Sequence, residues 1–191
     1  MTSLIDQGLA HHDAGDLDRA EQCYLDAVTQ NGTDTEALKL LALVMMEKGN
    51  ADEAGTYIEA AVDLQPAVAQ YRHLLGRIRA AQGRMPEAAE ALRLASDQAG
   101  PERFLILCDL GLCLEQLQSW DEAERVYAEI LMYEPNNRTA LHGKAGSAVA
   151  LGDLDTARDT YQLLLKLDPT DSAASSGMAQ VLGWIADKTL P

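Results

Sequence analysis

The sequence contains few aromatic side chains. Only one of its 191 residues is Phe, and Phe, Trp and Tyr together make up 5% of the chain. Hydrophobic residues nevertheless reach 47%, so most of the apolar content is aliphatic or small. Small and aliphatic side chains let helices approach closely and suit a β-sandwich less well. We therefore expect a folded, mainly helical chain that is long enough to form its own core.

Basic residues are also scarce. The chain has 15 Lys and Arg against 30 Asp and Glu, which gives a formal net charge of −15. This charge repels nucleic acid and anionic lipid, so no nucleic-acid partner is expected. A basic or neutral protein segment is the favoured partner. The charge also keeps a protein soluble, and we favour that interpretation over an acidic recognition face.

Cysteine pairs and long apolar runs are missing. Cys23, Cys108 and Cys113 are an odd number without a CxxC pair, which argues against a disulfide framework and a structural zinc site. The first residues lack a basic start followed by an apolar run, and no window holds eighteen apolar residues. We expect a cytoplasmic protein without membrane insertion.

One segment recurs along the chain. Its shared alanines are separated by 34, 34, 35 and 34 residues, a period typical of repeat arrays: Ala20, Ala54, Ala88, Ala123 and Ala157. Each repeat contains two amphipathic stretches, which predicts helix, turn, helix. We expect a single domain over 1–191, with repeats near 1–34, 35–68, 69–103, 104–137 and 138–171. A capping helix over 172–188 completes it, with Met178, Val181, Leu182 and Ile185 facing the last repeat.

The predicted helices carry start and stop residues. Glycines stand where first helices end, at Gly15, Gly49, Gly83 and Gly152, and Gln118 replaces them once. Candidate N-caps of the second helices are Asp16, Asn50, Ser119 and Asp153. Prolines follow three second helices, at Pro66, Pro135 and Pro169. One extra residue separates the third and fourth repeats, and we interpret it as a loop insertion at 97–101, or as a change in superhelical pitch.

These residues resemble the tetratricopeptide repeat. In the fourth repeat the family's places are filled by Leu107, Leu110, Gly111, Leu114, Ala123, Tyr127 and Pro135. The resemblance implies an all-α fold, a right-handed α-solenoid of antiparallel helix pairs. It also implies that Tyr24, Tyr127 and Tyr161 are core residues and that Trp120 packs the turn between two helices.

The sequence contains no recognisable catalytic machinery. We find no phosphate-binding loop, no HExxH motif and no nucleophile with an identifiable base. His11, His12 and Asp13 are adjacent, but neighbouring helical side chains point about 100° apart and do not converge on a metal. We expect no catalytic residue, no metal and no cofactor, and therefore a protein that is not an enzyme.

The resemblance implies a concave peptide-binding groove lined by first helices. Transferred place by place, the groove residues are Lys39, Leu40, Leu43, Met46, His73, Leu74, Arg77, Leu105, Cys108 and Leu112. The carboxylate clamp of the family's chaperone-tail binders is absent, because its places are filled by Ile5, Leu9, Leu40, Gln70 and Leu74. An apolar strip with a few charges suits an amphipathic helix or hydrophobic peptide. The alternative is that these leucines pack the repeats against one another.

A group of arginines lies in the third repeat, at Arg72, Arg77, Arg79 and Arg84. We expect their stems to pack along the helices and their heads to pair with acidic neighbours, although an anion-binding spot is the sharper hypothesis.

The leading hypothesis is a scaffold or adaptor that binds a peptide or helix of a partner protein. The alternative is the partner-docking region of a larger enzyme such as a transferase. A third hypothesis is self-association through the terminal repeats, where Trp184 is a large apolar residue to leave in water.

Overall fold

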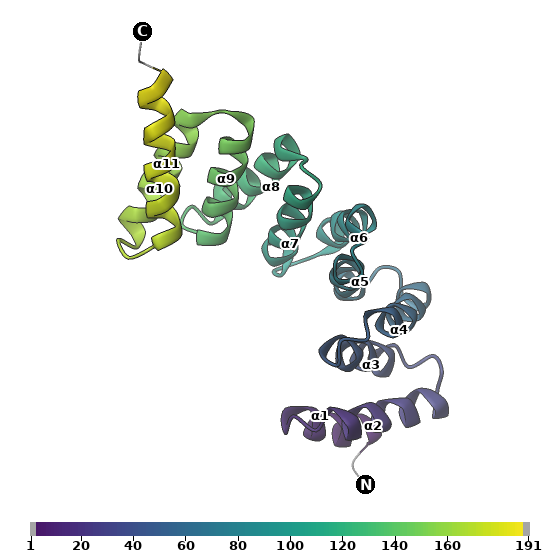
Figure 1. Ribbon diagram of the computed structural model, residues 1–191. Coiled ribbons are helices and arrows are strands. Elements are labelled where there is room, and N and C mark those ends of the chain that lie inside the picture. The colour runs from purple at the N-terminus through teal and green to yellow at the C-terminus, as the bar shows by residue number, and fades with distance from the viewer. Residues whose placement is uncertain (1–2, 189–191) are drawn as a thin grey trace. The chain divides into compact units, whose positions relative to one another are not determined.

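The computed structural model describes residues 3–188, and every regular element in this range is an α-helix (Figure 1). The helices are α1 (Leu4–Asp13), α2 (Leu17–Gln30), α3 (Thr35–Glu47), α4 (Ala51–Leu64), α5 (Ala69–Ala81), α6 (Met85–Gln98), α7 (Arg103–Gln116), α8 (Trp120–Tyr133), α9 (Arg138–Leu151), α10 (Leu154–Leu167) and α11 (Ser172–Lys188). Five helix pairs and a final single helix confirm the expected all-α repeat fold. The ends of the predicted domain, 1–2 and 189–191, lie outside the described residues.

The turns inside the helix pairs confirm the predicted stop residues. The four turn glycines have φ between 75° and 82°, the left-handed region that a residue without a Cβ adopts easily. Gln118 occupies the same turn between α7 and α8 with φ of 56°. Among the predicted N-caps, Asp16 and Asp153 accept a backbone N–H, whereas the side chains of Asn50 and Ser119 make no capping bond.

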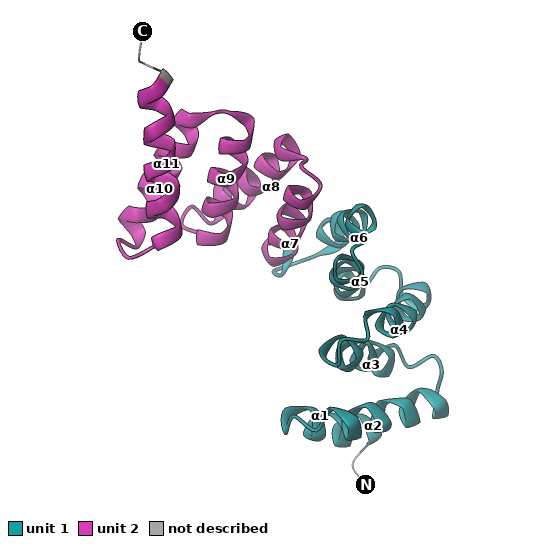
Figure 2. Cartoon of the chain, in the orientation of Figure 1, with its two compact units in different colours: residues 1–103 teal, residues 104–191 magenta. Residues whose placement is uncertain are grey.

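The described chain divides into two compact units, residues 1–103 and 104–191 (Figure 2). The boundary falls beside the extra residue of the fourth repeat. In the connection between the first two repeats, the N–H of Asp34 donates to the carbonyl oxygen of Asn31, which is eleven residues after Ala20. The corresponding bond before α7 runs from Arg103 to Gly100, which is twelve residues after Ala88. The extra residue therefore precedes this turn, between Gln98 and Gly100, in agreement with the loop insertion predicted at 97–101.

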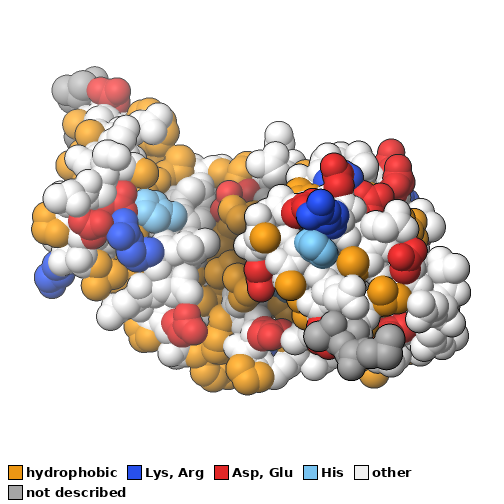
Figure 3. Space-filling view, turned by 90° about the horizontal axis from the view of Figure 1, so that it is seen from below, with side chains coloured by type: hydrophobic (Ala, Val, Ile, Leu, Met, Phe, Trp, Pro, Cys, Tyr) orange, Lys and Arg blue, Asp and Glu red, His pale blue; other side chains and the backbone are white. Residues whose placement is uncertain are grey.

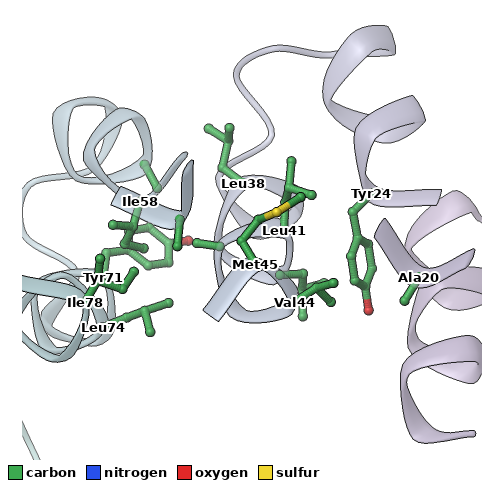
Figure 4. Packing of buried hydrophobic residues seen from close by; sticks show 14 residues of the cluster. Ala20, Tyr24, Leu38, Leu41, Val44, Met45, Ile58, Tyr71, Leu74 and Ile78 are labelled. Carbon is green, nitrogen blue, oxygen red and sulfur yellow. The ribbon is translucent and has the colours of Figure 1, made fainter. Parts of the chain in front are cut away.

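The core of unit 1 is built around α3. Figure 4 shows its side chains between Tyr24 of α2 on one side and Ile58 and Tyr71 on the other. Leu41 and Val44 are completely buried there, and burial of such side chains stabilises the unit by about 1.5–3 kcal/mol each. The buried hydroxyl of Tyr71 donates a hydrogen bond to Thr35 Oγ1 at 3.0 Å, which joins α5 to α3.

Tyrosines against glycines make up much of the remaining core. Tyr127 of α8 is completely buried, and its ring fills the space where side chains at Gly111 and Gly143 would lie. Its hydroxyl donates to Glu115 at 2.8 Å, and burial together with this carboxylate raises the pKa of Tyr127. Tyr24 packs in the same way against Gly8 in unit 1. The prediction that Tyr24 and Tyr127 are core residues is confirmed, whereas Tyr161 is only partly buried and packs against Gly177 of α11.

Helix α11 covers the end of unit 2 with one face. Val181 is buried beside Ala148 and Ala157, and Ile185 packs against the same cluster. Leu182 was expected on this face, but it is 47% exposed. Val181 takes the inward position, and the next residue lies about 100° further around the helix. Trp184 is 39% exposed, as the sequence suggested.

Candidate functional site

Helix α3 supplies four of the predicted groove residues, and they differ in burial. Leu40 is 6% exposed and belongs to the core of unit 1. Leu43 and Met46 are half-buried and pack against that core from outside. Lys39 is half-buried, and its Nζ donates to Glu36 Oε1 at 2.8 Å within the same helix. On α3, therefore, Leu40 is a core residue, while Leu43 and Met46 remain partly accessible to solvent.

Helix α5 supplies three more predicted groove residues. Leu74 is 7% exposed and packs in the same core as Leu40. His73 is half-buried and Arg77 is exposed. The burial of Leu40 and Leu74 agrees with the alternative considered above, that part of the apolar strip holds the unit together.

Helix α7 in unit 2 presents the most open apolar surface among the predicted groove residues. Leu105 is 60% exposed and Leu112 is 49% exposed. The two side chains are seven residues apart, which places them on one face of the helix, about two turns from each other. We call these two residues the α7 surface. Cys108 lies between them in sequence but is buried, and burial raises the pKa of its thiol.

The opposite side of α7 is apolar as well. Leu107, Leu110 and Leu114 are 3%, 3% and 1% exposed and face the core of unit 2. A helix at the surface of a soluble protein normally turns polar residues toward water. The outer face of α7 carries Leu105 and Leu112 with Asp109 between them, so it is suited to contact a surface that is largely apolar.

The arginines of the third repeat are largely engaged within unit 1. Arg79 pairs with Glu59, Arg84 with Glu87, and Arg72 Nε donates to the carbonyl oxygen of Pro66 at 2.9 Å. For Arg79 and Arg84 this agrees with the favoured interpretation, that their guanidinium groups pair with acidic neighbours. The pairs leave these guanidinium groups little capacity to bind an anion.

A polar cluster in unit 2 escaped the sequence analysis. The carboxylate of Asp171 caps α11 by accepting the N–H of Ala174 at 3.0 Å. It also lies 2.8 Å from both Arg138 Nη2 and His142 Nε2 of α9. These contacts, the backbone N–H foremost, hold the pKa of Asp171 well below its usual range. The position of Asp171 just before α11 could have predicted its capping role from the sequence, because Asp34 and Asn137 precede and cap α3 and α9 in the same way.

His12 has a structural partner. Its Nε2 lies 3.0 Å from Glu47 Oε1, and its ring meets the edge of Tyr24, so it links α1 to α2 and α3. Within residues 3–188 no group of three or more His, Cys, Asp or Glu side chains is arranged to hold a metal ion. None of the described helices has the length and apolarity to cross a membrane.

Acidic side chains are spread over the face drawn in Figure 3, with few Lys and Arg among them. On this face the acidic side chains lie at separate places. Spread charge of this kind favours solubility and disfavours an anionic partner of large area.

Comparison with known proteins identifies the repeat in both units. Two tetratricopeptide repeat family models match the sequence, one at residues 5–69, 41–104 and 74–131 and the other at 114–181. The Cellulose synthase 1 operon protein C of Komagataeibacter xylinus is 31% identical over 195 residues. That alignment covers 94% of this chain but only 14% of the relative. A TPR repeat-containing protein of Methanocaldococcus jannaschii is 29% identical, with 83% of this chain and 28% of that protein covered.

Solved structures share the fold at lower identity. A tetratricopeptide repeat protein from Parabacteroides merdae has a TM-score of 0.84 at 21% identity, covering 96% of this chain and 72% of that one. YrrB, described as a TPR protein with an unusual peptide-binding site, has a TM-score of 0.80 at 17% identity, with 91% and 89% covered. MamA has a TM-score of 0.79 at 21% identity, with 83% and 92% covered.

Proposed function

We propose that this chain, which belongs to the tetratricopeptide repeat family, is a non-enzymatic scaffold that binds an amphipathic or hydrophobic segment of a partner protein. The observation that carries the proposal is the α7 surface. Leu105 and Leu112 remain 60% and 49% exposed although the other side of the same helix already fills a core. Covering both side chains removes apolar area from water at about 25 cal/mol per Å², which supplies affinity for a partner's apolar residues.

The half-buried residues of α3 are a second part of the proposed partner surface. Leu43 and Met46 offer apolar area, and Lys39 with its neighbour Glu36 offers charge that can fix the register of a bound segment. Leu40 and Leu74 do not contact the partner in this proposal. They are buried in the core of unit 1 and hold α3 and α5 in place.

The experiment is affinity capture from the source cells with the wild-type chain and two variants. The first variant carries Leu105→Asp and Leu112→Asp, which place charge on the α7 surface. The control carries Met132→Asp, because Met132 is 73% exposed on the second helix α8. We expect a specific set of partners, identified by mass spectrometry, to be lost with the double variant and kept with the control. Equal recovery by all three chains contradicts the proposal.

A second candidate function is the substrate- or partner-docking region of a larger enzyme such as a transferase. One observation favours it: the relative named for a cellulose synthase operon aligns with 94% of this chain within 14% of its own length. Similar arrays therefore occur as parts of much longer proteins. The intact mass of the native gene product tests this candidate. A mass well above 20.7 kDa supports it, and a mass equal to that of this chain contradicts it.

A further inference from the structure

Unit 2 contains a pocket lined by both first and second helices. It has a volume of about 420 Å³ and is lined from α8, α9 and α10 and the segment that follows α8. Four side chains of the lining are aliphatic, Leu131, Pro135, Leu141 and Leu163, and two are charged, Lys144 and Asp159. None of these residues belongs to the α7 surface.

Lys144 is out of place in the repeat. It precedes Ala157 by thirteen residues, and the residues thirteen before Ala54 and Ala123 are Leu41 and Leu110. Those leucines are 0% and 3% exposed. Lys144 is half-buried, so a cation stands where the second and fourth repeats have a buried leucine; the third repeat has the partly buried Leu75 and the first the exposed Gln7. A lysine in this position can bury its aliphatic stem and leave the ammonium group available to an anionic group of a partner.

The acidic residue of the pocket is already neutralised. Asp159 Oδ1 accepts hydrogen bonds from Arg158 Nη2 at 2.8 Å and Nε at 2.9 Å. Lys144 forms no ion pair with any residue in the part of the chain that the structure describes. The charge of Lys144 contributes to lowering the pKa of Asp153, but without a direct contact. The largest cause of that lowered pKa is the hydrogen bond from Thr156. The positive charge in the pocket is therefore uncompensated.

We infer that this pocket binds a segment of a partner protein that presents an aliphatic side chain next to an Asp or Glu carboxylate. The aliphatic side chain packs among the three leucines and Pro135, and the carboxylate pairs with Lys144. A basic segment does not fit, because Lys144 repels it and Asp159 is occupied by Arg158. A partner's helix or extended strand supplies both groups on adjacent residues or one helical turn apart.

This site differs from the proposed partner surface in both place and chemistry. The α7 surface is on α7 and selects apolar residues, whereas the pocket is lined by α8, α9 and α10 and selects an acidic–aliphatic pair. The protein can then hold two different segments at once, as expected of a scaffold.

The test uses two blocked peptides, N-acetyl-Glu-Leu-Leu-amide and N-acetyl-Gln-Leu-Leu-amide, added to the isotope-labelled chain and followed by NMR. We expect the Glu peptide to shift the resonances of Leu131, Leu141, Lys144 and Leu163 and to bind about fivefold more tightly than the Gln peptide, as a partly exposed ion pair gives. In Lys144→Met the two peptides should bind equally. Equal binding to the wild-type chain, or shifts confined to other residues, overturns the inference.

A matched variant separates loss of the site from loss of folding. Lys144→Met keeps an unbranched aliphatic side chain at a half-buried place, so its thermal midpoint should equal or exceed that of the wild-type chain. The variant with Leu105→Asp and Leu112→Asp should keep the preference for the Glu peptide. If it loses that preference, the pocket is not an independent site and the inference fails.

Discussion

The ring of Tyr127 occupies the space that a side chain at Gly143 would need, and this contact locks α8 against α9. We predict that Gly143→Ala destabilises the protein by about 1–3 kcal/mol, because overpacking displaces a completely buried ring. Gly146 on the same helix is the control, because a Cβ there meets nothing within 4 Å. Gly146→Ala should instead stabilise by about 0.5–1 kcal/mol through helix propensity. Urea unfolding measures both, and equal effects would contradict this account of the packing.

The predicted groove residues should separate into packing and surface residues. Leu74→Ala is expected to cost about 2–5 kcal/mol of stability, because Leu74 is 7% exposed and its removal leaves a cavity. Leu105→Ala should change stability by less than about 0.5 kcal/mol, because Leu105 is 60% exposed. Chemical denaturation of the two variants checks the difference. A large loss for Leu105→Ala would mean that this side chain is part of the fold.

Asp171 makes unit 2 sensitive to acid. Its pKa is lower in the folded protein than in the unfolded chain, so its contribution is present above the unfolded pKa and is lost as the pH falls toward the folded pKa. Stability should therefore decrease below about pH 4, near the ordinary pKa of Asp. In Asp171→Asn the N-cap is kept but the ionisable group is gone, so stability should depend less on pH in this range. Thermal melts from pH 3 to pH 7 make the comparison, and parallel curves for the two proteins would refute it.

The turn between α7 and α8 carries avoidable strain. Gln118 has φ of 56°, a conformation that glycine adopts without steric cost at the four equivalent turns. Gln118→Gly should raise stability by about 0.5–1 kcal/mol, and the reciprocal change Gly152→Gln should lower it by about 1 kcal/mol. Differential scanning calorimetry of both variants is decisive, because shifts of the same sign cannot follow from backbone strain.

The sequence predicted the helices well because their signals are local. A 34-residue period and glycines at the turns depend on residues near each other in the chain, and the structure confirms them at Gly15, Gly49, Gly83 and Gly152. The loop insertion at 97–101 was predictable from the same period, because one spacing of 35 residues stands among three of 34. The turn hydrogen bond from Arg103 to Gly100 places the extra residue in the connection before α7.

Burial within the predicted groove could not be obtained from the sequence. Leu40 and Leu105 are both leucines at groove places of first helices, yet they are 6% and 60% exposed. The difference arises from which neighbouring helices cover each place, and that is tertiary information. Lys144 did carry a sequence signal, because it departs from Leu41 and Leu110 at one repeat place. Its meaning became clear only with the pocket around it.

The central claim is that partners bind at the α7 surface, and site-specific photo-crosslinking tests it most directly. The crosslinking residue p-benzoylphenylalanine replaces Leu112 in one chain and Met132, 73% exposed on α8, in another. Both chains are expressed in the source cells and irradiated. The account predicts a covalent partner adduct from position 112 and none from position 132. An adduct from position 132 with none from position 112 would contradict it.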